Sequence, residues 1–104
     1  MPFGGDWKAL YQAAREGELE ALTRWLDQGV DPNFQHPEFG TTPLIAAAEM
    51  GQLEAVKALV ARGAQVDAIS DWDRCTAEQA ALELGHQKVA HWLRAQSPAA
   101  KPRD

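Results

Sequence analysis

A spacing of 34 residues repeats along the chain, and it constrains the fold more than any other feature of the sequence. Gly17, Gly51 and Gly85 form one series at this spacing. Five residues of the first unit also recur unchanged in the second, where Leu10, Ala14, Leu19, Glu20 and Ala21 correspond to Leu44, Ala48, Leu53, Glu54 and Ala55. A period of about 20 to 50 residues is the signature of stacked structural repeats. The sequence therefore predicts a repeat array rather than one layered core.

Residues 41–63 show what each unit contains. Thr42 suits the cap of a helix and Pro43 its first position, because a proline there loses no hydrogen bond. Gly51 can adopt the left-handed conformation that ends a helix, and an apolar stripe restarts at Leu53 and stops at Gly63. Two antiparallel helices of roughly eight to ten residues are predicted, and helices this short need neighbours packed against them.

Three such units are predicted within a single domain at 1–96, covering residues 6–40, 41–74 and 75–96. Each consists of a helix, a turn, a second helix and a polar loop, and residues 97–104 are expected to form a disordered tail. The expected packing between units places Leu22, Trp25 and Leu26 against Val56, Leu59 and Val60, and it buries Leu53 as well as Leu59. Polar residues appear in the third unit where the second has Leu44, Leu53 and Val60, namely Glu78, Gln87 and Arg94. We therefore expect the array to stop there and the chain to be complete.

Composition narrows the classes of function. A chain of 104 residues with 45% hydrophobic and 24% charged residues has the balance of one soluble domain. It contains no apolar run long enough to span a membrane and no secretory signal, so a cytoplasmic location is expected. Cys75 is the single cysteine, which excludes an internal disulfide. The net charge of −5 disfavours nucleic acid as a partner.

The stretch "TTPLIAAAEMGQLEAVKALVARGAQVDA" at residues 41–68 resembles an ankyrin repeat, with its Thr-Pro-Leu start, paired alanines, central glycine and Gly-Ala-x-Val-Asp ending. The first and third units resemble the family in part. The chain departs from the family at Ile45, where a histidine is usual, and in a period that is one residue longer than the usual ~33. The resemblance implies an all-α ankyrin-repeat solenoid of three helix-turn-helix units, joined by β-hairpin-like fingers, with the terminal repeats acting as caps.

Residues that could carry catalysis or bind a metal are sparse. His86 and His91 are five residues apart, which does not place both on one helical face for a metal ion. Asp71 and Asp73 lack the serial oxygen donors of a calcium loop and are interpreted as turn residues. Cys75 and His86 could in principle form a nucleophile and base, although no orienting third group is evident. We expect no enzymatic activity, no metal and no cofactor.

The resemblance also implies which residues meet a partner, because similar proteins bind through loop tips and exposed positions of each first helix. Mapped onto this sequence, these positions are Trp7, Arg15 and Glu16; Glu38, Phe39, Thr41, Glu49 and Met50; and Ile69, Trp72, Asp73, Cys75, Glu83 and Leu84. The set mixes acids with large apolar residues, which favours a protein partner with basic and apolar features. Two alternatives remain open: Trp72 packs onto its own finger, and the acids form only a solvated face.

The predicted function is a protein-protein interaction module, binding through its concave face and loop tips. It could serve as a dedicated inhibitor or immunity-type partner of an effector, and a monomer is expected. The alternative is a structural scaffold that self-assembles through the ends of its stack. Arg74 stands where the family has a glycine with positive φ, so either the turn is rearranged or the side chain is retained for contact.

Overall fold

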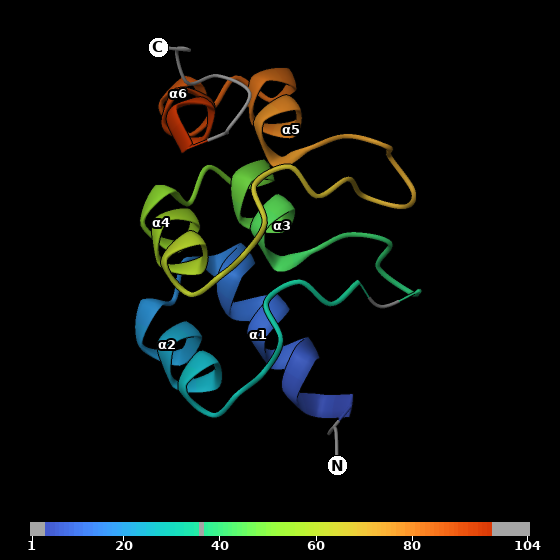
Figure 1. The fold of residues 1–104 in the computed structure, drawn as a ribbon, viewed down its shortest axis with the longest axis vertical. Coiled ribbons are helices and arrows are strands. Elements are labelled where there is room, and N and C mark those ends of the chain that lie inside the picture. The colour runs from blue at the N-terminus through green and yellow to red at the C-terminus, as the bar shows by residue number, and fades with distance from the viewer. Residues whose placement is uncertain (1–3, 36, 97–104) are drawn as a thin grey trace, which may run out of the picture.

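The computed structural model describes residues 4–35 and 37–96, and for residues 4–6 it describes the backbone alone. Six helices follow one another in the described chain: α1 (Gly4–Glu16), α2 (Leu19–Asp27), α3 (Pro43–Glu49), α4 (Leu53–Ala61), α5 (Ala77–Glu83) and α6 (Gln87–Gln96). Within these residues there is no β-strand, and the helices form three antiparallel pairs stacked along one axis (Figure 1). The predicted all-α repeat architecture is confirmed. The tail predicted at 97–104 lies outside the described residues.

Helix α3 begins at the predicted capping residue Thr42. The hydroxyl of Thr42 accepts a hydrogen bond from the Ile45 N–H at 3.2 Å, and Pro43 occupies the first position of α3. In the third repeat Thr76 and Gln79 form a reciprocal capping box at the start of α5. Both devices satisfy N–H groups that a helix leaves unpaired at its beginning.

The core combines closely packed alanines with larger buried side chains such as Leu10 and Leu44. The alanine pairs of α1 and α3 are fully or almost fully buried, so these helices pack closely, and α3 packs in turn against α5. Leu22 of α2 and both Val56 and Leu59 of α4 are completely buried. Leu53 differs from the prediction, because it is only partly buried at the first position of α4. No helix within the described residues is long and apolar enough to cross a bilayer.

Two loops project from the helices on the side of α1, α3 and α5 (Figure 1). We call residues 30–41 the first finger and residues 64–75 the second finger. Side-chain amides join them. Asn33 donates to the Gly63 carbonyl at 3.1 Å and accepts from the Gln65 N–H at 2.8 Å. Gln35 donates to the Ile69 carbonyl at 2.9 Å and accepts from the Asp71 N–H at 3.0 Å. Each finger is therefore held by its neighbour as well as by its own turn.

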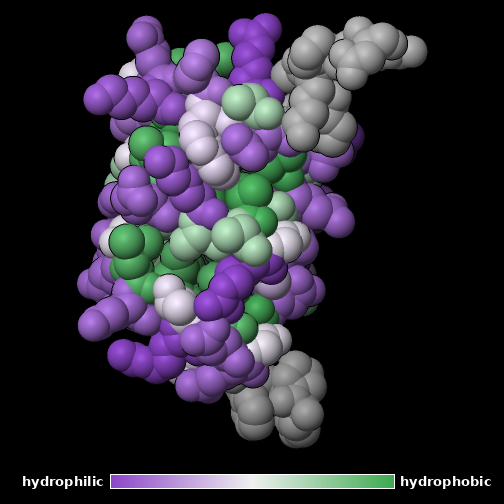
Figure 2. Space-filling view, turned by 60° about the vertical axis from the view of Figure 1, so that its left-hand side comes forward, coloured by the Kyte–Doolittle hydropathy of each residue, from purple (hydrophilic) through white to green (hydrophobic). Residues whose placement is uncertain are grey.

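The opposite side of the stack is formed by α2, α4 and α6. With this side turned forward, the surface is mostly hydrophilic, and apolar residues are gathered in its middle part (Figure 2). At the C-terminal end of the described stack, Gln87 and Arg94 are exposed and Glu78 is partly exposed. Polar residues thus stand at the three positions where the second repeat carries Leu44, Leu53 and Val60.

Candidate protein-binding surface

Trp72, at the tip of the second finger, packs against the neighbouring finger. Its indole lies over the α-carbon of Gly40, so closely that a β-carbon there would collide with the ring. The backbone N–H groups of Asp71 and Trp72 both donate to the Gly40 carbonyl, at 2.9 and 3.3 Å. The side chain nevertheless remains 63% exposed. Trp72 is therefore held in place from one side and open to solvent on the other.

Arg74 closes the turn of the second finger in a left-handed backbone conformation. Its φ of +57° is close to the +63° of Gly40, which stands 34 residues earlier. The turn is made by hydrogen bonds from the Ser70 N–H to the Cys75 carbonyl and from the Arg74 N–H to the Ser70 carbonyl, both 2.9 Å long. The backbone has thus kept the conformation that suits glycine, which excludes the rearranged turn. Strain of this kind at a non-glycine residue is often associated with a functional site.

The carboxylate of Glu49 interacts electrostatically with that of Asp73, the residue after Trp72. Burial raises the pKa of Glu49, at the end of α3, and the negative charge of Asp73 raises it further, while Arg15 acts in the opposite direction. Asp73 is itself exposed in the second finger. The structure thus brings together two acidic residues that are far apart in sequence, and their negative field is only partly offset by Arg15.

Exposed apolar side chains accompany these acids. Met50 and Leu84 directly follow α3 and α5, at equivalent places in two helices that pack side by side, and both are exposed. Ile69 is also exposed in the second finger, and Glu83 ends α5. We call the finger surface the set of Glu49, Met50, Ile69, Trp72, Asp73, Glu83 and Leu84.

Other residues expected to meet a partner are differently placed. Phe39 packs edge-on against Trp7, with ring centroids 5.0 Å apart, and against Tyr11 at 4.3 Å, while Trp7 also contacts Phe34 at 5.8 Å. These aromatics join the first finger to α1, so Phe39 and Trp7 are partly buried rather than free anchors. Thr41 is only 7% exposed and cannot present its side chain to a partner.

The remaining positions from the predicted set vary in exposure. Arg15, Glu16 and Glu38 are exposed, and Glu16 accepts a hydrogen bond from Gln12 at 2.5 Å. Cys75 is half-buried, with its sulfur 3.8 Å from the Ser70 hydroxyl.

The candidate catalytic residues have structural contacts. Nε2 of His86 lies 2.9 Å from the Glu49 carbonyl oxygen, to which it donates a hydrogen bond. His91 is exposed on α6. Among residues 4–35 and 37–96 no cluster of three potential metal ligands occurs. The contacts of Cys75 and His86 therefore fit packing roles.

Comparison with known proteins agrees with the architecture. The family model described as ankyrin repeats (three copies) matches residues 10–103. The chain is 40% identical over 86 residues to the human ARF GTPase-activating protein GIT1, covering 83% of this chain and 11% of that protein. It is 35% identical over 86 residues to the Drosophila melanogaster ARF GTPase-activating protein Git, covering 83% of this chain and 12% of the relative. A shorter match of 48% identity over 50 residues is to the human SH3 and multiple ankyrin repeat domains protein 2, covering 47% of this chain and 3% of that protein.

The chain thus spans only about a tenth of the length of the first two relatives. Ankyrin repeats are in general modules for protein-protein interaction and are typically not catalytic. The repeat period, the six stacked helices and the match over residues 10–103 lead to one conclusion: this chain belongs to the ankyrin-repeat family.

Proposed function

We propose that the chain is a non-enzymatic recognition module whose finger surface binds a protein partner with basic and apolar features. The observation that carries this proposal is the position of Trp72, which is 63% exposed although its ring rests on Gly40. An exposed tryptophan that is already immobilised loses little conformational entropy on binding, and tryptophans are enriched among residues that dominate binding energy.

The preference for a basic partner follows from the acids around the tryptophan. The negative charge of Asp73 adds to the cost of ionising Glu49, and a lysine or arginine from a partner would offset this cost. The Trp72 ring could also stack on such a cation. Met50 and Leu84 supply apolar contact area on the adjoining helix ends. In this role the chain would act as an adaptor or as a dedicated inhibitor of a single target.

The test compares the wild-type chain with the Trp72→Ala variant as baits for crosslinking and mass spectrometry in a lysate of the source cells. A partner of the finger surface is captured by the wild type and lost with the variant. Titration calorimetry with the purified partner should then show a loss of affinity of at least about 30-fold, the effect of a tryptophan that contributes about 2 kcal/mol.

Leu19→Ala provides a matched control, because Leu19 is an exposed apolar residue on α2, away from the fingers. Circular dichroism of both variants checks that the fold is intact. If the partner binds Trp72→Ala and the wild type with equal affinity, the binding site lies elsewhere and the proposal fails.

A further inference from the structure

Helix α6 differs from the other helices in its charge. Of the helices that the structure describes, it is the only one without an acidic residue, although the chain as a whole carries a net charge of −5. Lys88, His91 and Arg94 are all exposed on it. None of the three makes an ion pair within residues 4–35 and 37–96, whereas Arg62 pairs with Asp27 at 2.5 Å. Positive charge is thus concentrated on α6, in a protein that is acidic as a whole.

An open groove lies beside Lys88, His91 and Arg94. Its apolar lining comes from Leu82 of α5, from Ala90, Trp92 and Ala95 of α6, and from Leu53 at the start of α4. Gln87, Lys88, His91 and Arg94 contribute polar lining. Glu78 is the one acidic residue in the lining among the described residues. We call this the α6 groove. It lies at the C-terminal end of the described stack, and α6 and the fingers are on opposite sides of α5 (Figure 1).

The exposure of Leu82 indicates that this end of the stack is more than a polar cap. The equivalent residues of the first two repeats, Ala14 and Ala48, are fully buried against neighbouring helices. In the third repeat a larger apolar residue takes this place and is 55% exposed. Nearby positions of the same end have changed from apolar to polar, as at Glu78 and Arg94. Capping alone would favour a polar residue at 82 as well, so the exposed leucine is consistent with a contact site.

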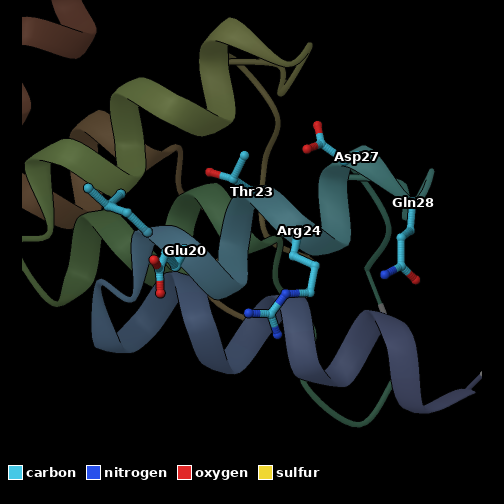
Figure 3. Close-up of a pocket in the computed structure, with 6 residues that line it drawn as sticks. Glu20, Thr23, Arg24, Asp27 and Gln28 are labelled. Carbon is cyan, nitrogen blue, oxygen red and sulfur yellow. The ribbon is translucent and has the colours of Figure 1, made fainter.

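The hollow on α2 shows that such a charge pattern is not general to the outer helices. Its lining contains Glu20, Arg24 and Asp27 together with neutral residues, and the labelled side chains project from the outward face of α2 (Figure 3). The lining of this hollow has two acidic residues and one arginine, and Asp27 already forms an ion pair with Arg62. The α6 groove has the opposite balance, with Lys88 and Arg94 against the single acid Glu78 among its described lining residues.

We propose that the α6 groove is a second docking site, which binds an acidic peptide segment carrying an apolar side chain. Charge complementarity selects this occupant. Arg94 can hold a carboxylate through two parallel hydrogen bonds, and Lys88 attracts a second acid as a point charge. The apolar side chain of the peptide covers Leu82. Because α6 and the fingers lie on different sides of α5, both surfaces can be occupied at once, and the chain can link two partners.

The experiment uses the full chain labelled with ¹⁵N and two synthetic peptides. In one peptide leucine alternates with aspartate and glutamate, and in the other lysine replaces every acid. The acidic peptide should give saturable chemical-shift changes confined to α5, α6 and the start of α4, and the lysine peptide should not. Absence of saturable binding by the acidic peptide, changes centred on the fingers, or an equal response to both peptides would overturn the proposal.

Three variants then test the residues. The double charge reversal Lys88→Glu, Arg94→Glu should weaken binding of the acidic peptide by about tenfold or more, because it replaces attraction by repulsion. The control Arg24→Glu makes a similar change on α2 and should leave the affinity unchanged. Leu82→Ala restores the alanine of the other repeats, so the fold should persist while affinity falls by about fivefold.

The oligomeric state separates a second copy of this chain from a foreign acidic segment. Light scattering of the wild type should show no association that depends on Lys88 and Arg94. Self-association abolished by the double charge reversal would instead identify another copy as the occupant and overturn the assignment. Unchanged peptide affinity in both the double reversal and Leu82→Ala would also overturn it.

Discussion

Arg74 occupies a backbone conformation that glycine adopts at a lower cost. The equivalent residue of the first finger, Gly40, has nearly the same φ, so the turn geometry is common to both fingers and only the residue differs. We expect Arg74→Gly to raise the free energy of unfolding by up to about 1 kcal/mol, because relief of left-handed strain exceeds the added entropy of the unfolded chain.

Urea unfolding followed by circular dichroism measures this change. Arg74→Ala is the control, since it removes the side chain but keeps the strained φ, and it should stay close to the wild type. A destabilised Arg74→Gly variant would instead show that contacts of the arginine side chain outweigh the strain.

Glu49 should make stability depend on pH in a defined direction. Its pKa is raised in the folded chain by burial and by Asp73, so the folded state binds a proton more readily than the unfolded state. The ionised carboxylate therefore lowers stability at neutral pH, and this loss disappears as the pH falls through the raised pKa to the ordinary glutamate range. Glu49→Gln should accordingly raise the melting temperature at neutral pH and do so much less in acid.

Thermal unfolding at neutral and at acidic pH tests this expectation. The Glu83→Gln variant, at an exposed position, is the control for the loss of one negative charge. An equal shift at both pH values would assign the effect to packing rather than to ionisation.

Not every contact residue could be predicted from the repeat register. The register identifies exposed backbone positions, and it correctly indicates exposure for Met50, Trp72 and Leu84. It cannot show that Phe39 turns toward Trp7 of α1, because that contact depends on how a loop folds back in three dimensions. Aromatic content near both α1 and the first finger was the available signal. Burial of an aromatic cluster competes with exposure to a partner, and in the first finger packing prevails.

At the scale of the helices, the second and third repeats are each tied to the preceding repeat by a side chain at the turn between their two helices. Gln52 donates to the Arg15 carbonyl at 3.2 Å, and His86 donates to the Glu49 carbonyl at 2.9 Å. Both contacts satisfy carbonyl groups that a helix leaves unpaired at its end. The glycine beside each contact, Gly17 or Gly51, has no β-carbon to obstruct the incoming side chain.

Two substitutions of His86 follow from this equivalence. His86→Gln should retain the contact, as Gln52 does, and remain close to wild type in stability. His86→Ala should lose about 1 kcal/mol, since one net hydrogen bond is removed and a helix-end carbonyl loses its partner. Chemical denaturation of both variants provides the measurement, and equal stability of the two would contradict a structural role for this hydrogen bond.

The helices themselves were well predicted because their signals are local. A threonine cap, a proline at the first position and a glycine with positive φ determine where α3 begins and where the turn after it lies. The fingers depend instead on Asn33 and Gln35, which reach backbone groups 30 and 34 residues away. The positions of Asn33 and Gln35 in the sequence do not indicate which backbone groups they bind, so the contact between the fingers is seen only in the three-dimensional structure.

At the scale of the whole molecule, stability depends on the middle repeat. Helices α3 and α4 contact both neighbouring pairs, and α2 and α6 lie on either side of α4. A repeat array gains stability from its interfaces more than from single units, and about three repeats are the minimum for independent folding. If the middle repeat separated from either neighbour, the outer repeat on that side would be an isolated pair of short helices, which is not stable in water. The three repeats should therefore unfold in one transition.

Leu59 tests this dependence, because it is completely buried in α4. Leu59→Ala should cost about 2 to 5 kcal/mol, a large part of the roughly 5 to 15 kcal/mol that a small domain possesses. Leu53→Ala is the matched control on the same helix, and it should cost roughly half as much because Leu53 is only partly buried.

Urea unfolding monitored by circular dichroism and by tryptophan fluorescence should give coincident curves, since Trp25, Trp72 and Trp92 lie in three different repeats. A Leu59→Ala variant in which fluorescence and helicity change at different urea concentrations would show that the outer repeats persist without the middle one, and would contradict a single cooperative stack.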